Sequence, residues 1–146
     1  MSLLLRDEPE LVQDVMTRNP INLSETATVL EAALAMREAD VGDVLVTRLD
    51  AVCGILTDRD IVVRMVADGG DPSRTTIGEI CSEDLTEVRP NDQLDFAIEL
   101  MRHRAIRRLP VVDDDRPVGI LSLGDLAFIR SPGSALADIS AAPPNT

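Results

Sequence analysis

The chain has 146 residues, of which 45% are apolar, and a formal net charge of −12 at pH 7. This length fits one compact module or two small units that need each other. Such an acidic chain argues against general nucleic-acid binding, which relies on basic side chains to neutralise phosphates. No apolar run approaches the roughly 20 residues of a membrane span, and no secretory signal is predicted. With its two cysteines, the chain fits a reducing cytoplasm.

An internal repeat organises the sequence. A shift of 65 residues aligns 12–66 with 77–131 without a gap, and most positions that differ keep their polarity. We therefore predict two repeats over these ranges, a turn-rich linker over 67–76 and a flexible C-terminal tail over 132–146. The identical pairs are Ala32/Ala97, Met36/Met101, Arg37/Arg102, Val46/Val111, Asp50/Asp115, Gly54/Gly119, Ile55/Ile120, Leu56/Leu121 and Asp60/Asp125.

Each repeat is expected to contain one helix with a single apolar face. Apolar residues recur at i, i+3, i+4 and i+7 over about 28–39 in the first repeat and about 93–104 in the second, which is the helical period. Ser24 and Asn91 are candidate start signals for these helices.

The remaining predicted elements are short strands and a second helix. A strand at about 21–23 or 86–88 precedes the first helix, and two further strands with a hairpin-length connector follow it. A helix opened by Thr57 or Ser122 ends each repeat, so the order is β-α-β-β-α and the fold class is α/β. The predicted hairpin strands are Asp43–Thr47 with Val52–Leu56, and Leu109–Val112 with Val118–Leu121.

One turn occurs twice, as GILTDRD at 54–60 and as GILSLGD at 119–125. A hydroxyl where a strand ends and a helix begins caps the helix, and an acidic residue three positions later favours the helix dipole. Capping leaves the glycine unexplained, because glycine inside a strand often marks the close approach of another backbone or of a ligand. Free amides at a helix start also attract anions. The turn is therefore a candidate nucleotide cradle.

The repeat and its motif G-h-x-[ST]-x-x-D resemble the CBS domain (cystathionine beta-synthase domain), and the resemblance covers about residues 12–130. It implies two repeats packed around a pseudo-twofold, a Bateman-type module, with clefts between the repeats that bind adenosine nucleotides. By the same resemblance, the aspartates accept hydrogen bonds from ribose hydroxyls, the hydroxyl residues hold phosphate, and residues near the start of each repeat contact the base. Carried onto this sequence, these are Asp60 and Asp125, Thr57 and Ser122, and Thr17, Ile21, Ser82 and Thr86.

The stretch RHRAIRR at 102–108 is the one basic island in the acidic chain. It fits a solvated helix end, where cations interact favourably with the helix dipole. Alternatively, Arg107 or Arg108 reaches an anionic ligand through two hydrogen bonds. Arg59, inside the first motif, is a further candidate for phosphate.

The two repeats are not equivalent at these positions. Gly42 and Asp43 stand where the second repeat has Arg107 and Arg108, and Leu45 replaces the proline of LPVVD. The sequence therefore leaves open whether two sites, one site or none can bind a ligand.

Catalysis is not predicted. His103 is the single histidine, and no second residue suggests a triad or an oxyanion hole. Cys53 and Cys81 resemble small core residues, and with one histidine they provide no metal-ligand spacing. A redox pair would need their Cα atoms within about 7 Å, which a sequence does not reveal. The acidic run at 113–115 fits a solvated hairpin turn.

The resemblance implies a stand-alone regulatory module without its own catalysis and without a catalytic cofactor. We expect AMP, ADP or ATP as a regulatory ligand, a homodimer, and an effector protein that responds to occupancy. The alternative is an interaction or stress-response protein that keeps the CBS fold without binding nucleotide. Neither nucleic acid nor membrane is an expected partner.

Overall fold

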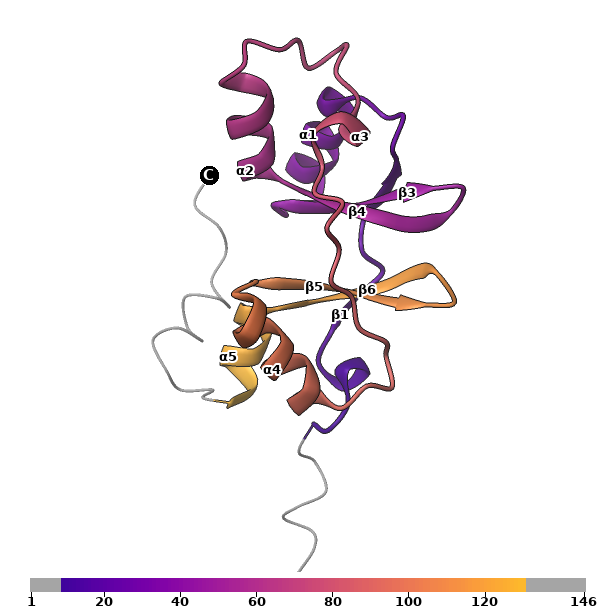
Figure 1. Ribbon diagram of the computed structural model, residues 1–146, viewed down its shortest axis with the longest axis vertical. Coiled ribbons are helices and arrows are strands. Elements are labelled where there is room, and N and C mark those ends of the chain that lie inside the picture. The colour runs from indigo at the N-terminus through magenta and orange to yellow at the C-terminus, as the bar shows by residue number, and fades with distance from the viewer. Residues whose placement is uncertain (1–8, 131–146) are drawn as a thin grey trace, which may run out of the picture. The chain divides into compact units, whose positions relative to one another are not determined.

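The computed structural model describes residues 9–130, which form two compact units (Figure 1). Of the described residues, unit 1 contains 9–18, 87–113 and 118–130. Unit 2 contains residues 19–86 and the turn Asp114–Pro117. The predicted tail over 132–146 lies outside the described residues.

Unit 2 is a three-stranded sheet with helices on one face (Figure 1). In the strand order β2-β3-β4, the first pair is parallel and the second is antiparallel. Its elements are β2 (Asn22–Ser24), α1 (Val29–Ala39), β3 (Asp43–Arg48), β4 (Ala51–Thr57), α2 (Asp58–Ile61), the π-helix η3 (Val62–Val66) and α3 (Ile77–Ile80).

Unit 1 is also a small sheet carrying helices, in the strand order β1-β6-β5 with β1 antiparallel to β6. Both units mix helices and strands, which confirms the predicted α/β class. The elements of unit 1 are the 3₁₀ turn η2 (Val12–Asp14), β1 (Thr17–Arg18), α4 (Leu94–Arg104), β5 (Arg108–Asp113), β6 (Arg116–Ser122) and α5 (Leu123–Arg130).

The two helices predicted from their apolar faces are present as α1 and α4, but their start signals are wrong. Thr28 caps α1 by accepting the Glu31 N–H at 3.1 Å, and α4 follows Gln93 without a side-chain cap. The Ser24 hydroxyl instead accepts the N–H of Thr26 at 3.3 Å, forming a local turn before the helix. Asn91 precedes the α4 cap position by two residues.

The four predicted hairpin strands are present and slightly longer than expected. The turns between them place Leu49 and Asp50, and Asp114 and Asp115, at positive φ. Two consecutive residues at positive φ form the type I′ turn, whose twist matches that of the flanking strands. The acidic run at 113–115 is exposed at such a turn, as the sequence predicts.

The strand predicted at 86–88 is wrong, and two prolines explain its loss. In unit 2, β2 is extended on both sides by hydrogen bonds from Leu45 N–H to Ile21 and from Glu25 N–H to Thr47. The corresponding donor positions in unit 1 are Pro110 and Pro90, which have no N–H. Only a single parallel bridge between Val88 and Val111 remains there.

The helix predicted after Thr57 also differs from expectation. It forms α2 and then continues as the π-helix η3, within which Met65 is buried while Val62 is 58% exposed. In the second repeat, Leu126 of α5 is buried, and the side chain of Ile129 lies outside the described residues.

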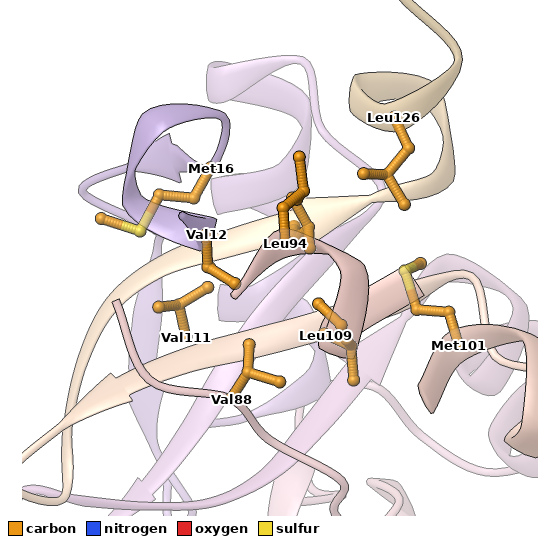
Figure 2. Packing of buried hydrophobic residues seen from close by; sticks show 10 residues of the cluster. Val12, Met16, Val88, Leu94, Met101, Leu109, Val111 and Leu126 are labelled. Atoms are coloured by element: carbon orange, nitrogen blue, oxygen red, sulfur yellow. The ribbon is translucent and has the colours of Figure 1, made fainter. Parts of the chain in front are cut away.

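Each unit has an aliphatic core that includes the opening segment of the other repeat. We use "opening segments" for residues 12–18 and 77–83. Val12 and Met16 of the first repeat belong to the core of unit 1, as Figure 2 shows, together with Val88, Leu94, Ala97, Met101, Leu109, Val111, Leu121 and Leu126. Ile77, Ile80 and Cys81 of the second repeat belong to the core of unit 2, with Val29, Ala32, Met36, Val44, Val46, Leu56 and Met65. The repeats exchange their opening segments.

Candidate functional site

The first motif forms a reciprocal helix cap at the end of β4. The Thr57 hydroxyl accepts the Asp60 N–H at 3.2 Å, and Asp60 Oδ2 accepts the Thr57 N–H at 2.9 Å. This arrangement is a capping box, which satisfies two backbone donors that a helix start would otherwise leave unpaired. Both side chains therefore have a structural role that is independent of any ligand.

The second motif repeats this geometry at the end of β6. The Ser122 hydroxyl accepts the Asp125 N–H at 3.1 Å, and Asp125 Oδ2 accepts the Ser122 N–H at 3.0 Å. No residue of the described chain donates a hydrogen bond to Asp125 Oδ1. One carboxylate oxygen of this motif thus has acceptor capacity that the cap does not use.

The motif glycines make room for backbone. A Cβ on Gly54 would lie 2.8 Å from the Ser82 carbonyl oxygen and 2.9 Å from Cys81 Sγ. A Cβ on Gly119 would lie 2.9 Å from the Thr17 carbonyl oxygen and 2.6 Å from Met16 Sδ. Of the two reasons for glycine given by the sequence, the close approach of another backbone is the one observed.

The opening segments pair with the motif strands at equivalent positions. Thr17 is the partner of Ile120 in β6, and Ser82 is the partner of Ile55 in β4. Each pair follows from the other by the repeat offset of 65 residues. The exchange of opening segments therefore brings each motif turn close to the start of the other repeat.

The residues predicted to contact the base are divided between the two units. Thr17 lies in unit 1 with the Ser122 turn, whereas Ser82 and Thr86 lie in unit 2 with the Thr57 turn. Ile21 also belongs to unit 2, where its half-buried side chain packs against the core. Thr17 and Ile21 thus belong to different units, although both are near the start of the first repeat.

The predicted arginines lie beside both turns. The Leu123 N–H donates to the Arg107 carbonyl at 2.9 Å, so this exposed arginine lies next to the second turn. Arg108 is half-buried at the start of β5. At the first turn, Asp58 N–H donates in the same way to Gly42 at 3.0 Å, and Arg59 is exposed on α2.

Arg64 also lies at the first motif, although it follows the motif in the sequence and does not belong to it. Its Nη1 donates to the carbonyls of Ile80 at 3.0 Å and Cys81 at 3.4 Å, and its Nε lies 3.8 Å from Asp60 Oδ1. It thus links the first motif to the opening segment of the second repeat. The signal that could have identified it is the internal alignment, where Ile129 occupies its position in the second repeat.

Both cysteines are free, and burial governs their chemistry. Burial, followed by the nearby Cys53, raises the pKa of the Cys81 thiol to about 11. Burial also raises the pKa of Cys53, which packs against the edge of the same core. Both residues are therefore neutral thiols at physiological pH, consistent with small core side chains.

No metal site or membrane span is found in the described part of the chain. Across residues 9–130, no group of three or more histidine, cysteine or acidic side chains is placed to hold a metal ion. Over the same residues, no helix has the length and apolarity needed to cross a bilayer. His103 is exposed on α4.

The family model of the CBS domain matches residues 12–67 and again residues 77–131. The chain belongs to the CBS domain family. The CBS domain-containing protein YhcV of Bacillus subtilis (strain 168) is 42% identical over 133 residues, which cover 88% of this chain and 94% of YhcV. Tandem CBS repeats and the fold of a CBS pair are thereby established.

Two solved CBS structures extend the comparison. Hypoxic Response Protein I, solved with two coordinated zinc ions, is 34% identical with a TM-score of 0.71, and the match covers 80% of this chain and 96% of that one. A CBS domain pair in complex with 5′-methylthioadenosine and S-adenosyl-L-methionine is 25% identical with a TM-score of 0.75, covering 86% and 100%. The zinc ions and the adenosine compounds are ligands of those two proteins.

Proposed function

We propose that this CBS pair is a regulatory module that binds an adenosine-type nucleotide and passes its occupancy to a partner protein. In this proposal the ribose hydroxyls donate to a motif aspartate, Asp60 or Asp125, and phosphate is held by Thr57 or Ser122 with the neighbouring arginines. Thr17 or Ser82 and Thr86 contribute to the base side of the site. The module performs no catalysis of its own and acts in the cytoplasm.

The observation that carries the proposal is the pairing of each motif turn with the opening segment of the other repeat. Thr17 lies opposite Ile120, two residues before Ser122, and Ser82 lies opposite Ile55, two residues before Thr57. Groups suited to phosphate, ribose and base thereby converge although they are far apart in sequence. A site made from both repeats also offers a physical route for a ligand to change how the repeats pack.

The adenosine part of the proposal is supported by a similar CBS pair whose structure contains S-adenosyl-L-methionine and 5′-methylthioadenosine. Both ligands carry ribose hydroxyls, from which a motif aspartate can accept hydrogen bonds. The arginines beside the turns, Arg59, Arg107 and Arg108, suit ligands that also carry phosphate, because guanidinium groups bind phosphate through two hydrogen bonds. We therefore include AMP, ADP and ATP among the candidates.

Thermal unfolding against a panel of these ligands tests the proposal. A ligand at about 100 times its dissociation constant stabilises the folded protein by about 2.7 kcal/mol, which raises Tm by several degrees. Asp60→Asn and Asp125→Asn serve as matched variants, because asparagine can still accept the capping hydrogen bond but lacks the carboxylate charge. We expect the shift to disappear in at least one of them. A flat panel for a folded protein would contradict nucleotide binding.

A homodimer is part of the proposal, and exposed apolar side chains on unit 2 support it. Leu30 and Leu34 on α1 are 42% and 43% exposed, and Val62 and Val66 on η3 are each 58% exposed. Apolar groups exposed in such number on two helices are suited to contact with another protein surface. A second copy of the chain is the partner that the CBS family suggests.

The alternative function is an interaction or stress-response protein that keeps the CBS fold without nucleotide. One observation favours it: in both motifs the hydroxyl and one carboxylate oxygen already accept backbone N–H groups in reciprocal helix caps. The similarity to Hypoxic Response Protein I agrees with it loosely. A flat ligand panel combined with a specific protein partner would favour this alternative.

A further inference from the structure

The two motif turns have the same caps but differ in the second oxygen of the aspartate. Asp60 Oδ2 is bound to the Thr57 N–H, and its Oδ1 faces the Arg64 guanidinium at 3.8 Å. Asp125 Oδ2 is bound to the Ser122 N–H in the same way, but no described residue binds its Oδ1. Among the described residues, the second carboxylate oxygen therefore faces a guanidinium at the first turn and has no hydrogen-bond donor at the second.

The position of Arg64 depends on local helix geometry and on several contacts. It lies on the π-helix η3, a rare conformation that is frequent at functional sites. The same guanidinium that faces Asp60 also donates to the carbonyls of Ile80 and Cys81. The Asp60 side chain is only 15% exposed while that of Arg64 is 48% exposed, so the ion pair is shielded from solvent on the carboxylate side.

A second difference between the turns points the same way. Asp58 Oδ2 lies 2.9 Å from where a Cβ of Gly42 would be, so a carboxylate occupies the space beside this glycine. At the equivalent positions, the second turn has the apolar Leu123 and Arg107. At the first turn the charge of Asp58 offsets that of Arg59, whereas Arg107 adds a positive charge beside the second turn, so phosphate is attracted more strongly to the second.

We propose that Arg64 determines which motif turn binds the ligand. Because Arg64 engages Asp60, the adenosine ligand binds at the Ser122–Asp125 turn alone. This inference rests on the proposed function and narrows it to one site. Arg64 acts as a positioning residue: it contacts the aspartate and the opening segment 77–83, and it fixes the first turn as a structural link. The second turn keeps the groups that bind the ligand.

The test compares binding stoichiometry in the wild type and in Arg64→Ile, which introduces the residue found at the equivalent position of the second repeat. Isothermal titration with ATP, AMP and S-adenosyl-L-methionine, each used separately, is expected to give one site per wild-type chain. Asp125→Asn should weaken that site at least tenfold. Arg64→Ile should add a second site, and Asp60→Asn in the Arg64→Ile background should remove it.

Two further variants serve as controls for the effect of Arg64→Ile. Arg64→Gln keeps an amide donor for the Ile80 carbonyl but removes the charge facing Asp60, and it should also add the second site if Arg64→Ile folds poorly. Arg74→Ile, which removes an exposed arginine paired with Asp71, should leave one site.

Two wild-type sites per chain, or one site in folded Arg64→Ile and Arg64→Gln, would overturn the selectivity role while leaving nucleotide binding intact. A single wild-type site that survives Asp125→Asn would overturn it equally. The absence of binding to every variant would contradict the proposed function and this inference together.

Discussion

At the scale of single residues, the motif glycines are explained by contact with backbone. Gly54 and Gly119 each lie against the carbonyl of an opening-segment residue, whose oxygen would be 2.8 and 2.9 Å from the Cβ of any larger residue. Backbone atoms in a paired strand move little, so a side chain at either position forces the strands apart. The glycines are thus needed to join the two repeats, whether or not a ligand is present.

Gly54→Ala is therefore expected to destabilise the protein by about 1–3 kcal/mol, the usual penalty for overpacking a tight site. Denaturant unfolding would measure the change. Ser24→Thr, which adds a methyl group to an exposed residue of β2, is the control and should have little effect. Equal stability of Gly54→Ala and the wild type would refute the close packing at this strand.

Cys81 provides a prediction about pH. Its pKa is raised from 9.0 to about 11 in the folded protein, chiefly by burial. The folded state therefore holds this proton more tightly than the unfolded state, and its contribution to stability is present below pH 9 and is lost as pH rises towards 11. Unfolding free energies measured from about pH 8 to 11 should fall less steeply for Cys81→Ala than for the wild type. Parallel pH profiles would contradict the burial of this thiol.

At the scale of elements, the helices and hairpins are well predicted from the sequence because their signals are local. The apolar spacing from Val29 to Met36 defines α1 without knowledge of any partner. The strand at 86–88 could not be rejected in this way. Its loss depends on Pro110, a donor position that becomes relevant only once the parallel pairing is known. The residues that lie beside each motif turn could not be predicted from the sequence either, because they come from the opening segment of the other repeat.

The helices of unit 2 carry the prediction about assembly. Leu34 is 43% exposed on α1, and a charge there should oppose burial in a dimer interface. Leu34→Glu is expected to shift the protein from dimer to monomer in sedimentation experiments. Arg37→Glu, at an exposed position of the same helix, should remain dimeric. A wild-type monomer, or a Leu34→Glu dimer of unchanged affinity, would exclude this face as the interface.

At the scale of the whole molecule, the folding units are not the sequence repeats. The core of unit 2 requires Ile77, Ile80 and Cys81 from the second repeat, all buried. The core of unit 1 requires Val12 and Met16 from the first. Each unit is therefore completed by a segment of the other repeat, and this exchange explains why each motif lies next to a segment from the opposite repeat.

This exchange predicts which fragment retains structure. A fragment spanning 19–86 contains every residue of the unit 2 core, whereas the repeat itself, 12–66, lacks the buried Ile77 and Ile80. Circular dichroism and thermal melting should show more structure in the 19–86 fragment. If 12–66 melts at the same temperature or higher, the opening segment 77–83 contributes little to that core.

The central claim is that an adenosine ligand binds at a motif turn, and amide NMR spectra recorded during ligand titration test it most directly. ATP, AMP and S-adenosyl-L-methionine would each be added to the isotope-labelled protein. We predict that the largest shifts fall on the amides of Ser122 to Asp125, on Thr17 across the paired strand and on Arg107. Spectra that do not change at millimolar ligand, or shifts confined to α1 and η3, would contradict the claim.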